Sequence, residues 1–221
     1  MTILKSFFNL FLQTNCPLCQ RSTQTEFCQY CTKQLQSCQL QNSSHLWKQP
    51  LPVFAWANYS GAVKRAIAIM KYENQPQIGR LFGQWLGEAW LLNPPFTQKL
   101  MVVPIPLHPS KQKQRGYNQA ALIAEGFCQI TGFKFKNNAL ARVKETQAQF
   151  GLSLTQRETN LAQAFSISSE FRHHPTEVPV LLIDDIYTTG ATAKSAIQTF
   201  QQSRISVLGL AAVATTAKVE G

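Results

Sequence analysis

The sequence predicts an α/β protein: a mostly parallel sheet with helices on both faces, preceded by a small cysteine-rich module. Three apolar runs, at residues 100–106, 178–183 and 205–215, alternate with helical patterns. Strands that are apolar at nearly every position are typical of parallel sheets buried on both faces. Five of the six cysteines lie between residues 16 and 38, which sets the N-terminal part of the chain apart.

The length and charge of the chain limit its organisation and its partners. A chain of 221 residues can bury a core without disulfides. We expect an N-terminal helix and cysteine module over residues 1–50 and the α/β domain over residues 51–221. The 21 basic and 11 acidic residues give a net charge of +10, which suits nucleic acid or a phosphate-rich small molecule. Composition alone fits an ordinary basic surface equally well.

The first sixteen residues carry apolar side chains at helical spacing and predict a short amphipathic helix that packs on the domain or on a partner. No small-residue cleavage site follows this segment, so it does not resemble a secretory signal. No run in the chain approaches the roughly 20 apolar residues that span a bilayer. We therefore expect no membrane insertion and a cytoplasmic location, where structural disulfides are rare.

Cys16, Cys19, Cys28 and Cys31 form two CxxC pairs separated by eight residues. Each pair turns tightly, and four thiolates satisfy the tetrahedral preference of zinc. The sequence thus predicts one structural Zn²⁺, around which such a small module folds. Cys38 is either a spare ligand or a buried thiol. The module could bind nucleic acid or dock a partner, and the Gln- and Ser-rich residues 34–49 predict a linker.

The helices of the α/β domain follow from periodic apolar positions and end signals. A turn at Tyr59–Gly61 precedes a helical pattern from Ala62 to Met70. A second pattern over residues 78–92 is stopped by Asn93-Pro94-Pro95. A third helix over residues 118–132 is closed by Gly132, and a fourth covers residues 192–202. These helices connect the predicted strands in the order that a parallel sheet requires.

Two adjacent carboxylates, Asp184 and Asp185, end the strand at residues 178–183, and a short hydroxyl-rich loop follows. Ligands of open parallel sheets bind at the carboxyl ends of strands, and a helix N-terminus favours anions. The predicted phosphate-binding loop comprises Thr188, Thr189, Gly190, Ala191 and Thr192. We expect Asp185 and Thr189 to point out of the end of the sheet, and the two carboxylates to suit vicinal hydroxyls or Mg²⁺. A ribose 5-phosphate meets both requirements, and no Walker loop is present.

The stretch LLIDDIYTTGAT, residues 181–192, closely resembles the 5-phosphoribosyl-1-pyrophosphate (PRPP) signature of type I phosphoribosyltransferases. Further segments resemble one branch, the ComF family of competence-related proteins. These segments are YSGAVKRAIAIMKY, VPIPLHPSKQKQRGYNQA and RVKETQAQFGLSLTQRETNLAQAF, at residues 59–72, 103–120 and 142–165. The resemblance covers nearly the whole chain and implies a type I phosphoribosyltransferase fold behind a zinc module. Tyr187 departs from it, since an aliphatic residue is usual there.

By this resemblance, residues 111–118 form a pyrophosphate-binding loop. Arg115 can bind a phosphate in a bidentate manner, Gly116 permits close approach, and Lys111 adds positive charge. Residues 141–160 are polar and weakly periodic, which is typical of a lid. The resemblance places a closing loop here, from which Arg142 or Lys144 could neutralise the departing pyrophosphate. Catalysis would then involve Asp184, Asp185, Arg142 and Lys144.

Two functions remain open at this stage. The first is a PRPP-binding protein of natural transformation that acts in DNA uptake and in processing incoming single-stranded DNA, together with DNA-processing or competence proteins. The second is an active PRPP- and Mg²⁺-dependent transferase of nucleotide or related metabolism with an unknown acceptor. The basic charge predicts weak, non-specific binding to single-stranded DNA. No segment clearly reads a nucleobase, and fold alone does not decide activity.

Overall fold

The computed structural model describes residues 14–144, 164–173 and 176–217. The predicted N-terminal helix lies almost entirely outside these residues, and Thr14–Asn15 form a short strand, β1. Most of the predicted lid at residues 141–160 also lies outside them. Within the described part of the chain, no helix is both long enough and apolar enough to cross a membrane.

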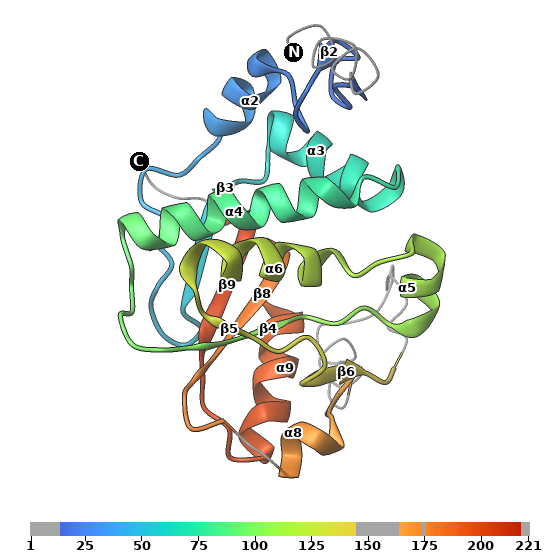
Figure 1. The fold of residues 1–221 in the computed structure, drawn as a ribbon. Helices are drawn as coiled ribbons and strands as arrows, with labels where there is room; N and C mark the ends of the chain where they lie inside the picture. The colour runs from blue at the N-terminus through green and yellow to red at the C-terminus, as the bar shows by residue number, and fades with distance from the viewer. Residues whose placement is uncertain (1–13, 145–163, 174–175, 218–221) are drawn as a thin grey trace, which may run out of the picture.

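A five-stranded parallel sheet forms the centre of the molecule, in the order β3-β9-β8-β4-β5 (Figure 1). β4 (Met101–Pro104), β8 (Val180–Tyr187) and β9 (Val207–Thr215) confirm the three predicted strands. β3 (Val53–Asn58) and β5 (Lys134–Phe135) are strands that the sequence analysis did not identify. All strands run the same way, so their carboxyl ends meet at one edge of the sheet.

Helices cover both faces of the sheet, as predicted. α3 (Gly61–Tyr72), α4 (Pro76–Leu92) and α6 (Gln119–Thr131) lie on one face, and α9 (Ala191–Gln202) lies on the other (Figure 1). A hairpin of β6 (Leu140–Arg142) and β7 (Phe165–Ile167), followed by α8 (Ser169–His173), joins the α9 side. These helices confirm the four helical patterns of the sequence.

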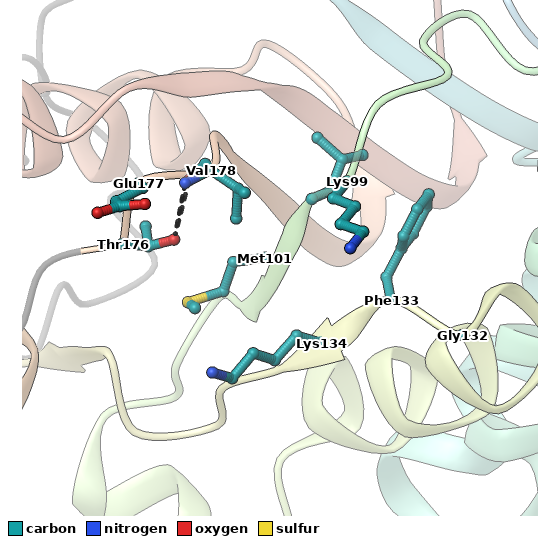
Figure 2. Close-up of a pocket in the computed structure, with 9 residues that line it drawn as sticks. Lys99, Met101, Gly132, Phe133, Lys134, Thr176, Glu177 and Val178 are labelled. Atoms are coloured by element: carbon teal, nitrogen blue, oxygen red, sulfur yellow. Dashed lines mark hydrogen bonds between the residues drawn. The ribbon is translucent and has the colours of Figure 1, made fainter.

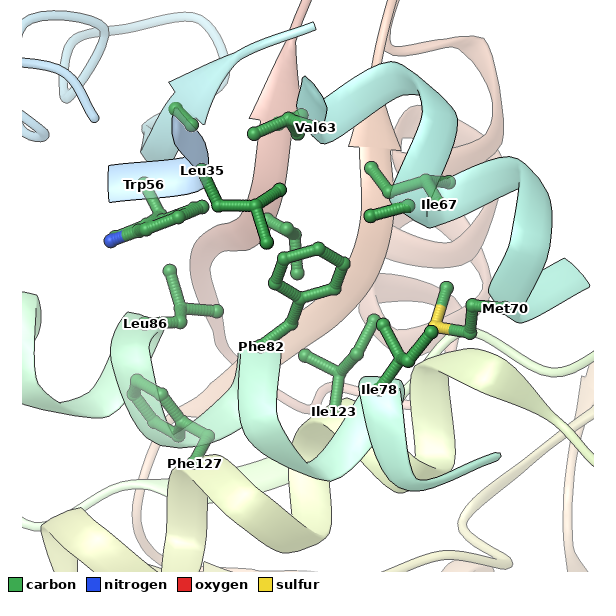
Figure 3. Packing of buried hydrophobic residues seen from close by; sticks show 14 of the residues in the cluster. Leu35, Trp56, Val63, Ile67, Met70, Ile78, Phe82, Leu86, Ile123 and Phe127 are labelled. Atoms are coloured by element: carbon green, nitrogen blue, oxygen red, sulfur yellow. The ribbon is translucent and has the colours of Figure 1, made fainter. Parts of the chain in front are cut away.

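Glycines let α4 and α6 cross closely. A Cβ atom at Gly83 would lie 2.0 Å from the carbonyl oxygen of Ile123, and one at Gly126 would lie 2.1 Å from that of Arg80. Around this crossing the largest apolar cluster fills the space between helices and sheet (Figure 3). Trp56 of β3, Phe82 of α4 and Phe127 of α6 are all buried in it. The cluster fixes the helices on this face of the sheet, including α3.

The cysteine module packs directly on this cluster. It consists of the antiparallel pair β1 (Thr14–Asn15) and β2 (Ser22–Thr23), followed by α2 (Gln29–Gln36). Leu35 of α2 is fully buried in the same cluster as Trp56, together with Phe27. The module therefore shares its apolar interior with the α/β domain.

The predicted linker at residues 34–49 is wrong. Gln34, Leu35 and Gln36 end α2, and the following residues run antiparallel beside β3. The amide of Leu40 donates to the carbonyl of Trp56 at 2.9 Å, and that of Ala55 donates to Ser43 at 3.0 Å. Buried leucines among the polar residues anchor the segment, and the free edge of β3 supplies backbone partners.

The predicted pyrophosphate loop also differs in conformation. Pro109–Arg115 form a short helix, α5. The turn begins only at Gly116, which has a left-handed conformation (φ 84°). The His108 side chain accepts a hydrogen bond from the Ser110 amide and caps the start of α5. Proline at the first helical position and this cap favour a helix over an open loop.

Candidate functional site

The two aspartates at the end of β8 face opposite sides of the sheet, because side chains alternate along a strand. Asp185 faces α3, where its Oδ2 lies 2.6 Å from the Nζ of Lys71. Asp185 is 5% exposed, so it does not point out of the end of the sheet as predicted. Burial of a carboxylate requires a partner, and the Lys71 ammonium group supplies it.

Asp184 is half-buried on the other side of β8, and its Oδ1 accepts the Asp185 amide hydrogen at 2.8 Å. Desolvation, followed by the charge of Asp185, raises the pKa of Asp184 well above its usual range. Burial lowers the pKa of Arg142, whereas the charge of Asp184 raises it, so the two groups attract each other. Arg142 lies at the end of β6, with its guanidinium 5.5 Å from the centre of the Phe165 ring.

Asp185 thus has Lys71 as a direct ion-pair partner, and Asp184 interacts with the charge of Arg142 on the other face of the sheet. This arrangement explains how two adjacent carboxylates persist at the end of a buried strand. It also leaves both cations beside the carboxyl edge, where an anionic ligand of a parallel sheet would bind.

The predicted phosphate loop connects β8 to α9. Thr188 and Thr189 are exposed, and Gly190 adopts φ 76° at the N-cap of α9 without a side-chain hydrogen bond to cap the helix. A Cβ atom at Gly190 would lie 2.9 Å from Cε2 of Tyr187, so the tyrosine ring rests directly on this glycine. The exposed hydroxyls and the N-terminus of α9 together form a surface that favours an oxyanion.

The basic residues predicted to bind pyrophosphate follow β4, the neighbouring strand. Lys111 is exposed on α5, and Arg115 is half-buried and donates from Nη1 to Oε1 of Gln119. Tyr117 donates from its hydroxyl to the backbone carbonyl of Met70, which ties this turn to the end of α3. Lys144 is exposed and its amide reaches the Ala164 carbonyl at 3.5 Å.

Lys71, near the end of α3, is a candidate-site residue that the sequence did not reveal, and Tyr72 follows it in the chain. Lys71 pairs with Asp185, and the Tyr72 ring lies 5.7 Å from the guanidinium carbon of Arg115. Both residues belong to the segment 59–72 that carries the ComF resemblance. That resemblance was the available signal, because neither contact is local in the sequence.

The four predicted zinc ligands come together. The Sγ atoms of Cys16, Cys19, Cys28 and Cys31 all lie within 4.8 Å of one another. The first pair lies in the turn after β1, and the second opens α2. A hydrogen bond with the Cys31 backbone lowers the pKa of Cys28 to about 7, which favours the thiolate that a metal binds.

Cys38 does not belong to this group, and its Sγ lies 3.4 Å from the Gln34 carbonyl oxygen. The four-thiol donor set in this compact arrangement can hold a metal ion such as zinc.

A cavity of about 560 Å³ opens at the opposite, amino edge of the sheet (Figure 2). Lys99, Lys134 and Glu177 surround an apolar floor that includes Met101 and Val178. None of the predicted site residues lines this cavity. The candidate site is therefore assigned from the chemistry of the carboxyl edge rather than from the size of a hollow.

Relatives of the chain were found among known proteins, although no protein-family model matches the sequence. Competence protein F of Haemophilus influenzae is 30% identical over 220 residues, which cover 92% of this chain and 93% of the relative. Competence protein ComFC of Streptococcus pneumoniae is 28% identical, and the aligned residues cover 85% of this chain and 74% of the ComFC chain. DNA utilization protein YhgH of Escherichia coli is 25% identical, with coverages of 83% and 82%.

Solved structures that align with the chain include an adenine phosphoribosyltransferase and a PRPP amidotransferase. Adenine phosphoribosyltransferase of Leishmania tarentolae aligns with a TM-score of 0.41 and 15% identity over 84% of this chain and 74% of that enzyme. Glutamine PRPP amidotransferase of B. subtilis aligns with a TM-score of 0.38 and 14% identity over 61% of this chain. The aligned part is only 25% of that amidotransferase chain.

The parallel sheet, the aspartate pair and the threonine–glycine loop define an α/β protein of the type I phosphoribosyltransferase fold class, here with an N-terminal four-cysteine module. Within that class, the extended identity with Competence protein F decides the family. The chain belongs to the ComF family of competence proteins.

Proposed function

We propose that this protein binds magnesium-PRPP at the carboxyl edge of its sheet and acts in natural transformation, in the uptake and processing of single-stranded DNA. One observation carries the ligand: two adjacent carboxylates, one of them paired with Lys71, lie next to a helix N-terminus with exposed threonines. The 5-phosphate would lie against residues 188–192, and the ribose would lie beside the aspartate pair, in which Lys71 holds Asp185. Arg115 and Lys111 would contact the pyrophosphate.

The names of the relatives support the biological role. Competence proteins and a DNA utilization protein are similar to this chain over most of its length. The net charge of +10 suits a polyanionic partner. We extend to this chain a role in handling incoming DNA, with Zn²⁺ in the four-cysteine module and Mg²⁺ bound together with PRPP.

Calorimetric titration tests the ligand assignment. Wild-type protein should bind magnesium-PRPP more tightly than ribose 5-phosphate, and Thr189→Val should weaken both because it removes a phosphate donor. A loss of about 1 kcal/mol is expected for one hydrogen bond. Thr199→Val, on the far part of α9, is the matched control and should bind as the wild type does. Equal affinities in all three proteins would contradict the assignment.

Arg142 supports turnover as a second candidate function, because a cation beside Asp184 could stabilise departing pyrophosphate. Isotopic exchange between PRPP and pyrophosphate, measured with candidate acceptor bases, separates an active transferase from a binding protein. Exchange that disappears in Arg142→Met would support turnover. No exchange by protein that binds magnesium-PRPP would support binding alone.

A further inference from the structure

An exposed aromatic ring lies at the rim of the carboxylate site. Tyr72, the last residue of α3, is 78% exposed. Its neighbour in the chain is Lys71, which holds Asp185. Tyr72 therefore follows, in the chain, the residue that holds Asp185.

Arg115 orders this ring from a different part of the chain. Its guanidinium carbon lies 5.7 Å from the ring centre, within the range of a cation–π contact. The guanidinium is fixed in turn by Gln119, and the Tyr117 hydroxyl ties the turn to the backbone of Met70. The Tyr72 ring is thus held in place although most of its surface is open to solvent.

The surroundings of Tyr72 are basic. α5, which ends at Arg115, carries exposed Lys111 and Lys113. Sequence-independent binding of single-stranded nucleic acid combines such a positive track for phosphates with aromatic rings on which bases stack. An arginine beside the ring adds a second planar group for stacking.

We propose that Tyr72, ordered by Arg115, is a platform on which a base of single-stranded DNA stacks at the rim of the carboxylate site. The ligand class is a nucleobase within a strand whose phosphates follow α5. This inference rests on the proposed function, because a protein that handles single-stranded DNA needs a contact with its bases. The sequence alone did not reveal such a contact.

An abasic strand isolates the stacking contribution from the phosphate contribution. Anisotropy titrations at one salt concentration would compare an oligothymidine with an abasic oligonucleotide of equal length. Wild-type protein should bind the oligothymidine about 5- to 100-fold more tightly, the range for stacking a base on an aromatic ring. Tyr72→Ala should bind both strands equally, and Tyr72→Phe should retain the preference because it retains the ring.

Tyr30 provides a matched control. It is 57% exposed and has the Arg21 guanidinium 5.1 Å from its ring centre, but it lies on the cysteine module. Tyr30→Ala should keep the preference for oligothymidine. A preference that survives Tyr72→Ala, or that is absent in wild type, would overturn the proposal, as would its loss in Tyr30→Ala alone.

Calorimetry with magnesium-PRPP keeps this proposal separate from the proposed function. Tyr72→Ala should bind magnesium-PRPP as wild type does. Wild-type protein that prefers the oligothymidine but does not bind magnesium-PRPP would refute the ligand assignment and support the platform. Protein that binds magnesium-PRPP without any base preference would refute the platform alone.

Discussion

At the scale of single residues, the ion pair of Lys71 and Asp185 is the contact that most changes the picture of the site. The two side chains are 18% and 7% exposed, so both charges are largely removed from water. Removing one partner of such a pair leaves an uncompensated charge, whereas replacing both is far less costly. The pair thus links α3 to β8.

We expect Asp185→Asn to lower the free energy of unfolding by roughly 3 kcal/mol, because it leaves the Lys71 ammonium unpaired. The double variant Lys71→Met with Asp185→Asn should recover most of this loss. Urea denaturation of the two variants and of wild type measures the difference. A single variant as stable as wild type would show that the pair does not contribute to folding.

The raised pKa of Asp184 predicts that its contribution to stability changes with pH in the opposite direction to that of an ordinary ion-paired carboxylate. Its pKa is raised in the folded protein, so the folded state binds the proton more tightly than the unfolded chain does. The stability that this group contributes is present below the unfolded pKa and is lost as pH rises through the folded pKa. Above its folded pKa, the ionised carboxylate therefore destabilises the fold.

Asp184→Asn should raise Tm near pH 8 by roughly 2–4 °C, the shift for about 1 kcal/mol in a chain of this size. The amide oxygen can still accept the Asp185 amide hydrogen, so the local geometry is kept. The gain should shrink near pH 4, where the carboxylate of the wild type is protonated as well. Thermal melts at both pH values provide the test, and a gain independent of pH would contradict it.

At the scale of elements, the cysteine module places its candidate metal ligands against the apolar core of the α/β domain. Cys16 and Cys31 are buried with Phe27 and Leu35 in the main apolar cluster. Loss of a bound metal would leave four unligated thiols beside that cluster, without the ion that holds the two cysteine pairs together. The packing of the module on the sheet would then weaken. Metal binding and the stability of the whole domain should therefore be linked.

Elemental analysis should find one zinc per chain in protein purified without added metal. Cys31→Ser should lose the zinc and lower Tm, because it removes one of four ligands. Cys38→Ser should keep it, since the Cys38 Sγ lies outside the group of four. Zinc retained by Cys31→Ser but lost in Cys38→Ser would reverse the assignment.

The elements that could be predicted from sequence are those with a strong local signal. α4 has periodic apolar residues and a following Asn-Pro-Pro stop, and β8 begins with an unbroken apolar run, Val180–Ile183. β3 lacks alternation because five of its six residues are buried, so its short run carries no period. The segment at residues 37–49 looks like a linker because its partner, the edge of β3, is recognised only in three dimensions.

The site follows the same rule. Asp184, the threonines and Gly190 are contiguous and could be recognised together, as could the four cysteines. The orientation of Asp185, its partner Lys71 and the stacked Tyr72 depend on how α3 ends beside β8 and α5. Those relations arise from packing between elements distant in the chain, which a local pattern does not encode.

At the scale of the whole molecule, the net charge of +10 should make binding to single-stranded DNA strongly dependent on salt. Each phosphate neutralised on a single strand adds roughly 0.7 to the slope of log affinity against log salt. Lys111→Gln with Lys113→Gln should therefore reduce the slope by about 1.4 if both contact phosphates. Anisotropy titrations over a salt series measure this slope, and an unchanged slope would remove α5 from the DNA path.

The sheet also gives the molecule two distinct edges. The carboxyl edge gathers the aspartate pair, its two cations and the threonine loop, whereas the amino edge holds the cavity around Lys99, Lys134 and Glu177. We propose that the phosphoribosyl ligand binds at the carboxyl edge. The central claim is therefore that the aspartate pair, with Lys71 bound to Asp185, is part of the site that binds that ligand.

Calorimetric titration of the double variant Lys71→Met with Asp185→Asn against magnesium-PRPP tests this claim most directly, because folding and binding are then separated. The variant should be folded, as shown by the denaturation experiment above. We predict that it binds magnesium-PRPP more weakly than wild type by roughly 1–3 kcal/mol, the range for a lost charge-assisted hydrogen bond. A folded double variant that binds magnesium-PRPP as tightly as wild type would contradict the claim.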